Sequence, residues 1–218
     1  MKKVWYAPYK FESYGEEEIK AVEESLRSGW LGGQGPKSVE FEKAIAERFG
    51  KKYGVFVNSG SSACLLAIAA LDLPRGSKII TPACTFSTTL APIIQLGYEP
   101  IFIDVGLTDY VADIDQVLAA ITEDVKAIIL PNLIGNKPNW FKLKTTLLTK
   151  GRDDIYLIED SADTIGYTYN KKNLGAYSDV VTNSMYASHV ITGAGFGGMV
   201  CFNDKDKYDR AKLLRGWG

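Results

Sequence analysis

A short polar turn, "VNSGSSAC" (57–64), joins an apolar run to a helical pattern. The first N–H groups of a helix and the positive end of its dipole attract anions. Gly60 allows close approach of the backbone to a ligand, and the hydroxyls of Ser61 and Ser62 add donors. The turn is therefore a candidate phosphate cradle, although a simple capped strand-to-helix turn explains the same residues. It is neither a Walker A loop nor a GxGxxG motif.

The segment "LIEDSAD" (157–163) ends a buried apolar run with acidic side chains. A carboxylate at the position of Asp160 can hold a protonated ring nitrogen through a charge-assisted hydrogen bond. Glu159 and Asp163 lie beside it in the sequence. Capping of the following turn and binding of a metal ion are the alternatives.

An aromatic residue, Phe86, stands in "TPACTFSTT" (81–89), which follows another apolar run. Its ring offers a flat face on which an aromatic ligand can stack. Taken alone, a phenylalanine at this place is more often a core residue.

The single histidine of the chain, His189, lies in "SMYASHVITGAGFGGMV" (184–200), between a strand-like run that ends at Ser184 and a glycine-rich stretch. An isolated histidine is usually a surface residue or a hydrogen-bonded core residue. A catalytic role becomes the better interpretation only if His189 shares one site with the other three segments.

Apolar runs and helical patterns alternate along the chain, and the runs are continuously apolar, which is typical of strands buried on both faces. They predict an α/β protein with a mostly parallel sheet covered by helices on both sides. Ligands bind at the carboxyl ends of such strands, where all four polar segments fall. The expected strands are 53–57, 77–80, 99–105, 125–130, 154–160, 178–185 and 198–202, and the expected helices are 13–29, 36–50, 61–71, 87–97, 113–121, 139–151 and 205–214.

Composition excludes several other classes of protein. The chain has 218 residues, 46% of them hydrophobic, and a formal net charge of −1, which gives no reason to expect a nucleic-acid or membrane partner. Cys64, Cys84 and Cys201 lack the spacing of metal ligands, and their odd number suggests reduced thiols. No signal peptide or membrane-spanning segment is recognisable. We therefore expect a cytoplasmic globular protein without a metal site.

Four motifs in this order and spacing, "GVFVNSGSSA", "ITPACTFSTT", "LIEDSADTIG" and "NSMYASHVITGAGFGG", resemble the DegT/DnrJ/EryC1/StrS family. Its members are pyridoxal-phosphate enzymes of the aspartate-aminotransferase fold (fold type I) that act on nucleotide-linked sugars. The resemblance implies a three-layer α/β/α large domain over residues 37–218, preceded by an N-terminal arm and helix over residues 1–36. The sequence ends at Gly218, so we expect the family's small C-terminal domain to be absent from it.

The same resemblance assigns roles to individual residues. Gly60, Ser61 and Ser62 would cradle the cofactor phosphate, together with Ser184. Phe86 would stack on the pyridine ring, and Asp160 would pair with the ring nitrogen. Asp163 stands where many members carry a glutamine near the ring.

His189 stands where the family's aminotransferases carry the lysine that binds the cofactor covalently. Histidine at this position, together with "NLIGN" (132–136), resembles the branch of nucleotide-sugar 3-dehydratases. The resemblance implies pyridoxal or pyridoxamine phosphate as cofactor and a GDP- or CDP-linked 4-keto-6-deoxyhexose as substrate. The histidine would then remove a proton from the cofactor, after which the C3 hydroxyl leaves.

Alternatives remain open at this point. A conventional sugar aminotransferase is disfavoured because position 189 is not lysine. A catalytically inactive cofactor-binding module is a second alternative, and a Rossmann-type oxidoreductase is disfavoured because no GxGxxG follows the first strand. Phe196 departs from the glutamate that the family commonly has before paired glycines. The resemblance also implies a homodimer, and the cysteines do not reproduce the ligand set of an iron–sulfur cluster.

Overall fold

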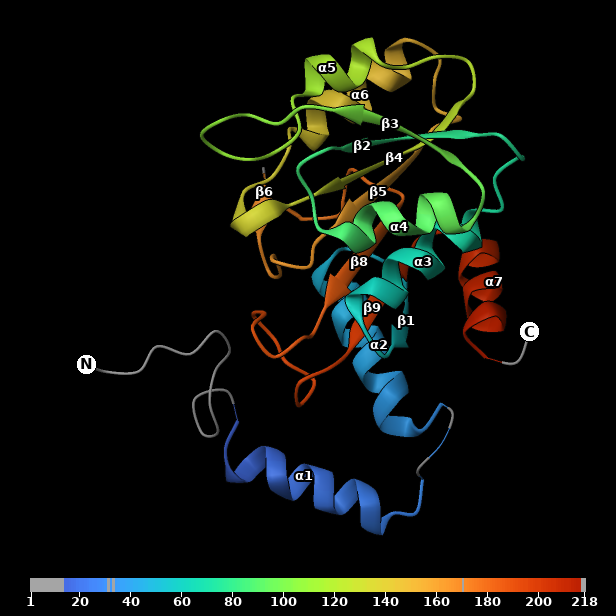
Figure 1. The fold of residues 1–218 in the computed structure, drawn as a ribbon. Coiled ribbons are helices and arrows are strands. Elements are labelled where there is room, and N and C mark those ends of the chain that lie inside the picture. The colour runs from blue at the N-terminus through green and yellow to red at the C-terminus, as the bar shows by residue number, and fades with distance from the viewer. Residues whose placement is uncertain (1–13, 31, 33, 170, 217–218) are drawn as a thin grey trace.

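A seven-stranded mixed sheet forms the centre of the protein in a computed structural model that describes residues 14–30, 32, 34–169 and 171–216 (Figure 1). The strand order is β1-β9-β8-β5-β4-β2-β3. The five strands from β8 to β3 run parallel, whereas β9 is antiparallel to both of its neighbours. This confirms the prediction of a mostly parallel sheet. The strands are β1 (Tyr53–Val57), β2 (Lys78–Pro82), β3 (Glu99–Ile103), β4 (Val125–Pro131), β5 (Tyr156–Asp160), β8 (Val180–Ser184) and β9 (Gly198–Phe202).

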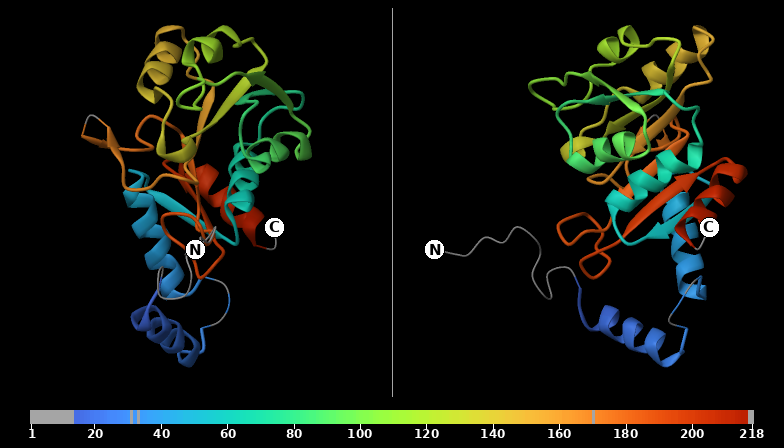
Figure 2. Two further views of the ribbon diagram at one scale, coloured as in Figure 1. Left: turned by 60° about the vertical axis from the view of Figure 1, so that its left-hand side comes forward. Right: turned by 45° about the vertical axis from the view of Figure 1, so that its right-hand side comes forward.

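Helices cover both faces of this sheet, which makes the predicted three layers (Figures 1 and 2). One apolar cluster joins α3, α4 and α7 to side chains on one face of the strands, including Val180 and Val200. The opposite face, which carries Val181 and Cys201, packs against α2, while α5 and α6 cover the part formed by β2, β4 and β5. The helices are α2 (Pro36–Arg48), α3 (Gly60–Leu71), α4 (Ser87–Gln95), α5 (Ile114–Ala119), α6 (Trp140–Thr149) and α7 (Lys205–Arg215).

The first helix, α1 (Glu16–Arg27), lies apart from these layers and contains no buried residue (Figure 1). Its apolar residues Ile19, Val22 and Leu26 are all exposed. The division at residue 36 that the sequence predicted stays a prediction, and most of the predicted arm, residues 1–13, lies outside the described part of the chain.

Three short elements were not predicted from the sequence. The strands β6 (Thr168–Tyr169) and β7 (Lys172–Asn173) form a small antiparallel hairpin, and η1 (Leu133–Gly135) is a single turn after β4. Elements of two or three residues are too short to show a hydrophobic period. Among the described residues, no helix combines the length and apolar character needed to cross a membrane.

Candidate active site

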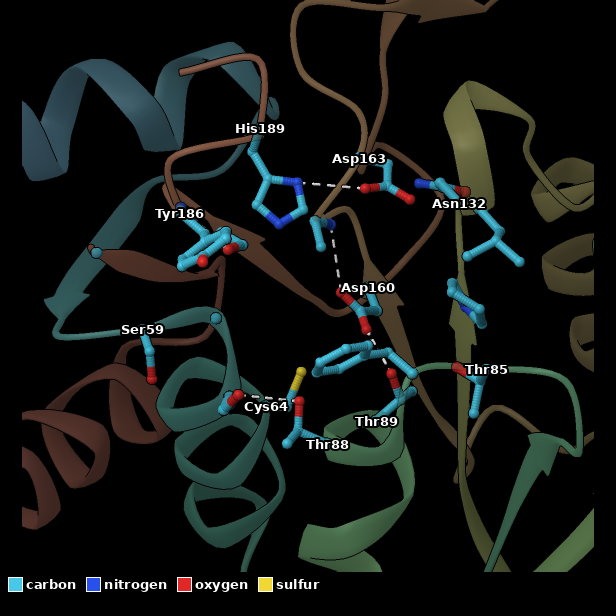
Figure 3. Close-up of a pocket in the computed structure, with 18 of the residues that line it drawn as sticks. Ser59, Cys64, Thr85, Thr88, Thr89, Asn132, Asp160, Asp163, Tyr186 and His189 are labelled. Carbon is cyan, nitrogen blue, oxygen red and sulfur yellow. Dashed lines mark hydrogen bonds and ion pairs between the residues drawn. The ribbon is translucent and has the colours of Figure 1, made fainter. Parts of the chain in front are cut away.

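A pocket of about 520 Å³ opens at the carboxyl ends of the parallel strands (Figure 3). This volume suits a small-molecule ligand. The wall is built from the turn before α3, the loop before α4, the ends of β4 and β5, and the loop after β8. Of the residues predicted from the sequence, all but Ser62 line it: Gly60, Ser61, Phe86, Asp160, Asp163, Ser184 and His189.

The first turn of α3 is fixed by Ser59, a residue that the sequence analysis did not single out. Ser59 has extended backbone angles, and its Oγ accepts a hydrogen bond from the Ser62 N–H at 3.1 Å, so it is the N-cap. The Ser59 hydroxyl in turn donates to Ser62 Oγ at 3.1 Å. The amide of Ser62 is therefore used within the turn, and its predicted role towards a phosphate stays a prediction.

The remaining amides at this end of α3 are suited to an anion. The first N–H groups of a helix have no carbonyl partner within it, and capping accounts only for that of Ser62. Gly60 and Ser61 line the pocket at this end of the helix, and the Ser61 hydroxyl donates to Thr88 Oγ1 at 3.0 Å on the pocket wall. A Cβ atom at Gly60 would lie only 2.7 Å from Ser184 Cβ. Glycine is therefore required for this turn to pack against the end of β8.

Asp160 ends β5 and is 7% exposed. Its carboxylate accepts hydrogen bonds from Thr89 Oγ1 at 2.7 Å, from the Ala162 N–H at 3.3 Å and from Thr182 Oγ1 at 3.4 Å. Burial raises the pKa of Asp160 in spite of these bonds, and the nearby charge of Asp163 raises it further. No salt bridge joins Asp160 to a cation within the described residues. A buried carboxylate at a pocket without a cationic partner fits a ligand that brings the positive charge, such as a protonated ring nitrogen.

The neighbouring acid, Glu159, faces the other side of the sheet. It is fully buried and accepts hydrogen bonds from Asn132 Nδ2 at 2.7 Å and from Ser178 Oγ at 3.1 Å. Burial raises its pKa as well. Successive side chains of a strand point to opposite faces, so only Asp160 of the pair reaches the pocket.

His189 lies on the loop after β8, and its Nδ1 is 3.2 Å from Asp163 Oδ1 (Figure 3). The ring of Tyr186 meets the imidazole edge-on, with 6.3 Å between the ring centroids. Gly195 and Gly197 hold positive φ angles of 111° and 149° where the loop returns to β9. Glycine is favoured at these two positions because it adopts positive φ angles without steric cost, which lets the loop fold back over the pocket.

Phe86 immediately precedes α4 and is 68% exposed on the pocket wall. The alternative that it is a core residue is therefore wrong. Its ring is available to a ligand, and stacking on an aromatic ring stays a prediction.

Several lining residues were missed by the sequence analysis. Thr89 lies inside a segment that was singled out, but a threonine in a helical pattern gives no sign that it will bond to a carboxylate 71 positions away. Further lining residues with a polar or aromatic side chain that were not assigned a role are Ser59, Cys64, Thr85, Thr88, Asn132 and Tyr186. In the part of the chain that the structure describes, no group of three or more His, Cys, Asp or Glu side chains could hold a metal ion.

Comparison with known proteins identifies the family of this chain. The sequence model of the DegT/DnrJ/EryC1/StrS aminotransferase family matches residues 12–218. The chain belongs to this family. A relative in Yersinia pseudotuberculosis, named GDP-4-keto-6-deoxy-D-mannose 3-dehydratase, is 36% identical over 97% of this chain and 54% of its own length. A GDP-perosamine synthase of Caulobacter vibrioides is 32% identical over 90% of this chain and 52% of that protein.

Solved structures of similar proteins have the same fold as this chain. The E. coli GDP-4-keto-6-deoxy-D-mannose 3-dehydratase with bound hydrated PLP superposes with a TM-score of 0.83 at 34% identity, over 96% of this chain and 53% of that one. The three layers described above are thus those of the large domain of fold type I enzymes of this family. The chain spans about half the length of the relatives it matches.

Proposed function

We propose that this chain is the cofactor-binding part of a pyridoxal- or pyridoxamine-phosphate-dependent sugar 3-dehydratase. Its substrate would be a nucleotide-linked 4-keto-6-deoxyhexose, and its product the sugar without the C3 hydroxyl, for use in deoxysugar or polysaccharide biosynthesis. The observation that carries the proposal is the single histidine of the chain, which lines the same pocket as a buried aspartate and an open helix N-terminus. Two relatives of more than 30% identity, one of them from Yersinia pseudotuberculosis and the other from E. coli, are named as 3-dehydratases of such a sugar.

The pocket residues fit the parts of the cofactor. The amides of Gly60 and Ser61, with the hydroxyl of Ser184, would bind the phosphate, because helix N-termini favour anions. Asp160 would hold the pyridine nitrogen, and the positive charge of the protonated ring would relieve the cost of burying that carboxylate. Phe86 would stack on the ring. When bound, the cofactor supplies an electron sink for the reaction.

His189 would act as the general base. Its imidazole has a nitrogen lone pair that can accept a proton, which suits proton removal beside the electron sink. It cannot attach the cofactor covalently as a lysine does. The cofactor would therefore be held by hydrogen bonds and stacking alone, which leaves the dehydration route open and removes the usual route of transamination.

We extend the proposal to the nucleotide of the substrate and to the quaternary structure. We expect a GDP-linked substrate, with CDP as the alternative, and a homodimer in the cytoplasm. The relatives named for GDP-sugars support the first expectation. The free thiols of Cys64, Cys84 and Cys201 agree with a reducing compartment.

Mass spectrometry of the sugar product tests the reaction. The protein is incubated with pyridoxamine phosphate and a GDP- or CDP-linked 4-keto-6-deoxyhexose, and the nucleotide sugar is analysed. Loss of one oxygen atom from the sugar, with one equivalent of pyridoxamine phosphate converted to pyridoxal phosphate and ammonia released, supports a 3-dehydratase. Appearance of an amino sugar would show an aminotransferase instead, and an unchanged sugar together with bound cofactor would show an inactive binding module.

A further inference from the structure

We propose that Asp163 is a positioning residue that fixes which ring nitrogen of His189 carries the proton, and not a ligand of the cofactor ring. The inference deepens the role of His189 and rests on the proposed function for its catalytic consequence. Its structural content, a single tautomer of one imidazole, can be tested without cofactor or substrate.

The contact between the two side chains is direct. Asp163 Oδ1 lies 3.2 Å from His189 Nδ1. A carboxylate attracts an N–H and repels a nitrogen lone pair, so a neutral imidazole at this distance favours the tautomer with its proton on Nδ1. The other ring nitrogen, Nε2, then keeps its lone pair. The side chain of Asp163 is 33% exposed and that of His189 is 21% exposed, so solvent screens this attraction in part.

The second oxygen of the same carboxylate is anchored by the backbone. Asp163 Oδ2 accepts a hydrogen bond from the Ile134 N–H at 3.0 Å. Ile134 has a φ of 54°, in the left-handed region that is rare for a β-branched residue. Such a conformation persists only when the surrounding structure over-determines it. The turn Leu133–Gly135 therefore holds its amide towards Asp163, and this bond fixes the carboxylate with Oδ1 beside His189.

The imidazole is also restrained on its other sides. The backbone N–H of His189 donates to the backbone carbonyl of Tyr186 at 3.0 Å, which holds the main chain that carries the imidazole, and the Tyr186 ring meets the imidazole edge-on. Figure 3 shows the ring of His189 between Asp163 and Tyr186, with its free edge towards the side of the pocket that holds Asp160. A proton on Nδ1 thus leaves the acceptor nitrogen on the edge that faces the pocket. This is the arrangement that a general base requires.

The replacement Asp163→Asn should reverse the tautomer. The Ile134 N–H needs an acceptor, so the carbonyl oxygen of the new amide is expected to turn towards Ile134. The NH₂ group then faces His189 Nδ1 and donates to it, which requires Nδ1 to be unprotonated. The proton moves to Nε2, and the nitrogen that faces the pocket loses its lone pair. The replacement removes a negative charge 3.2 Å from Nδ1, which is expected to change the tautomer ratio by about tenfold or more.

Nitrogen-15 NMR measures this ratio for one residue, because the chain contains a single histidine. The full chain is labelled with ¹⁵N-histidine and observed without cofactor, with the pH raised until the ring signals stop changing, so that the neutral imidazole is measured. We expect the wild type to carry the proton mainly on Nδ1 and Asp163→Asn to carry it mainly on Nε2. The control Asp153→Asn removes an exposed carboxylate at the opposite end of β5 and should keep the wild-type ratio.

A wild-type imidazole protonated mainly on Nε2 would overturn the proposal, even if the variant failed to fold. An unchanged ratio in a folded Asp163→Asn protein would also overturn it. Neither result bears on the dehydration reaction, which is measured separately by the mass of the sugar. A positioning role predicts in addition that Asp163→Asn lowers turnover while the affinity for pyridoxal phosphate changes little, whereas a cofactor ligand would lose affinity.

Discussion

Replacing Asp160 with asparagine should change stability and cofactor binding in opposite directions. In the protein without cofactor, this buried carboxylate has one short hydrogen bond, from Thr89 at 2.7 Å, and two long ones at 3.3 Å and 3.4 Å. These bonds do not offset the cost of burial, because the pKa of Asp160 is raised. The change Asp160→Asn keeps the shape and removes the charge. We expect the free energy of unfolding to rise by on the order of 1 kcal/mol at neutral pH, about the size of one net hydrogen bond.

The raised pKa of Asp160 also determines how the free energy of unfolding changes with pH. With a raised pKa in the folded state, Asp160 contributes most to stability at low pH, where it is protonated. This contribution is lost as the pH rises through the folded-state pKa. The stability advantage of Asp160→Asn should therefore be absent below the usual pKa of 3.8 and grow towards neutral pH. Urea denaturation of both proteins across this range measures it, with Asp153→Asn as the exposed control.

Cofactor affinity should fall in the same variant. A hydrogen bond to a charged group contributes about 1.5–3 kcal/mol, so the dissociation constant of pyridoxal phosphate should rise by about tenfold to about a hundredfold. Titration followed by absorbance measures this constant. A variant that is less stable than the wild type without cofactor, yet binds the cofactor as tightly, would refute the reasoning about Asp160.

Two further predictions concern packing and a buried charge. Gly60→Ala brings a Cβ to 2.7 Å from Ser184 Cβ and should lower the free energy of unfolding in urea by about 1–3 kcal/mol. Gly32→Ala, whose Cβ meets no described atom within 4 Å, should lower it by less than about 0.5 kcal/mol, and equal losses would contradict the close approach. Burial lowers the pKa of Lys51 from 10.5 to about 8, so the unfolded chain binds more protons between these values. The free energy of unfolding of the wild type, minus that of Lys51→Met, should then rise by about 3 kcal/mol from about pH 7 to about pH 10.5. A difference that does not change with pH would contradict the lowered pKa of Lys51.

The apolar strands and the polar residues that follow them allowed most of the fold and of the site to be predicted from the sequence. Continuous apolar runs indicated a sheet covered on both faces, and polar residues directly after them indicated where a ligand would bind. Asp160 and His189 belong to segments more than twenty positions apart, and the topology of the parallel sheet brings them to one pocket. The exposure of Phe86 could not be predicted in this way, because an aromatic residue after a strand fits a core equally well.

Tertiary contacts account for what the sequence did not predict. Ser62 has the residue type of a phosphate ligand, but the cap that Ser59 provides uses its amide. The bond from Thr89 to Asp160 joins two segments whose separation only the folded sheet determines. Ile134 has the residue type least suited to a left-handed conformation, so local propensity predicts the opposite of what is found.

Covalent labelling at position 189 tests the central claim most directly. The protein and its His189→Lys variant are each incubated with pyridoxal phosphate, reduced with borohydride, digested and analysed by mass spectrometry. We predict that the wild type binds the cofactor without a covalent adduct in the peptide that contains position 189, and that His189→Lys acquires one there. A variant saturated with pyridoxal phosphate but unlabelled at position 189 would contradict the assignment of this pocket to the cofactor.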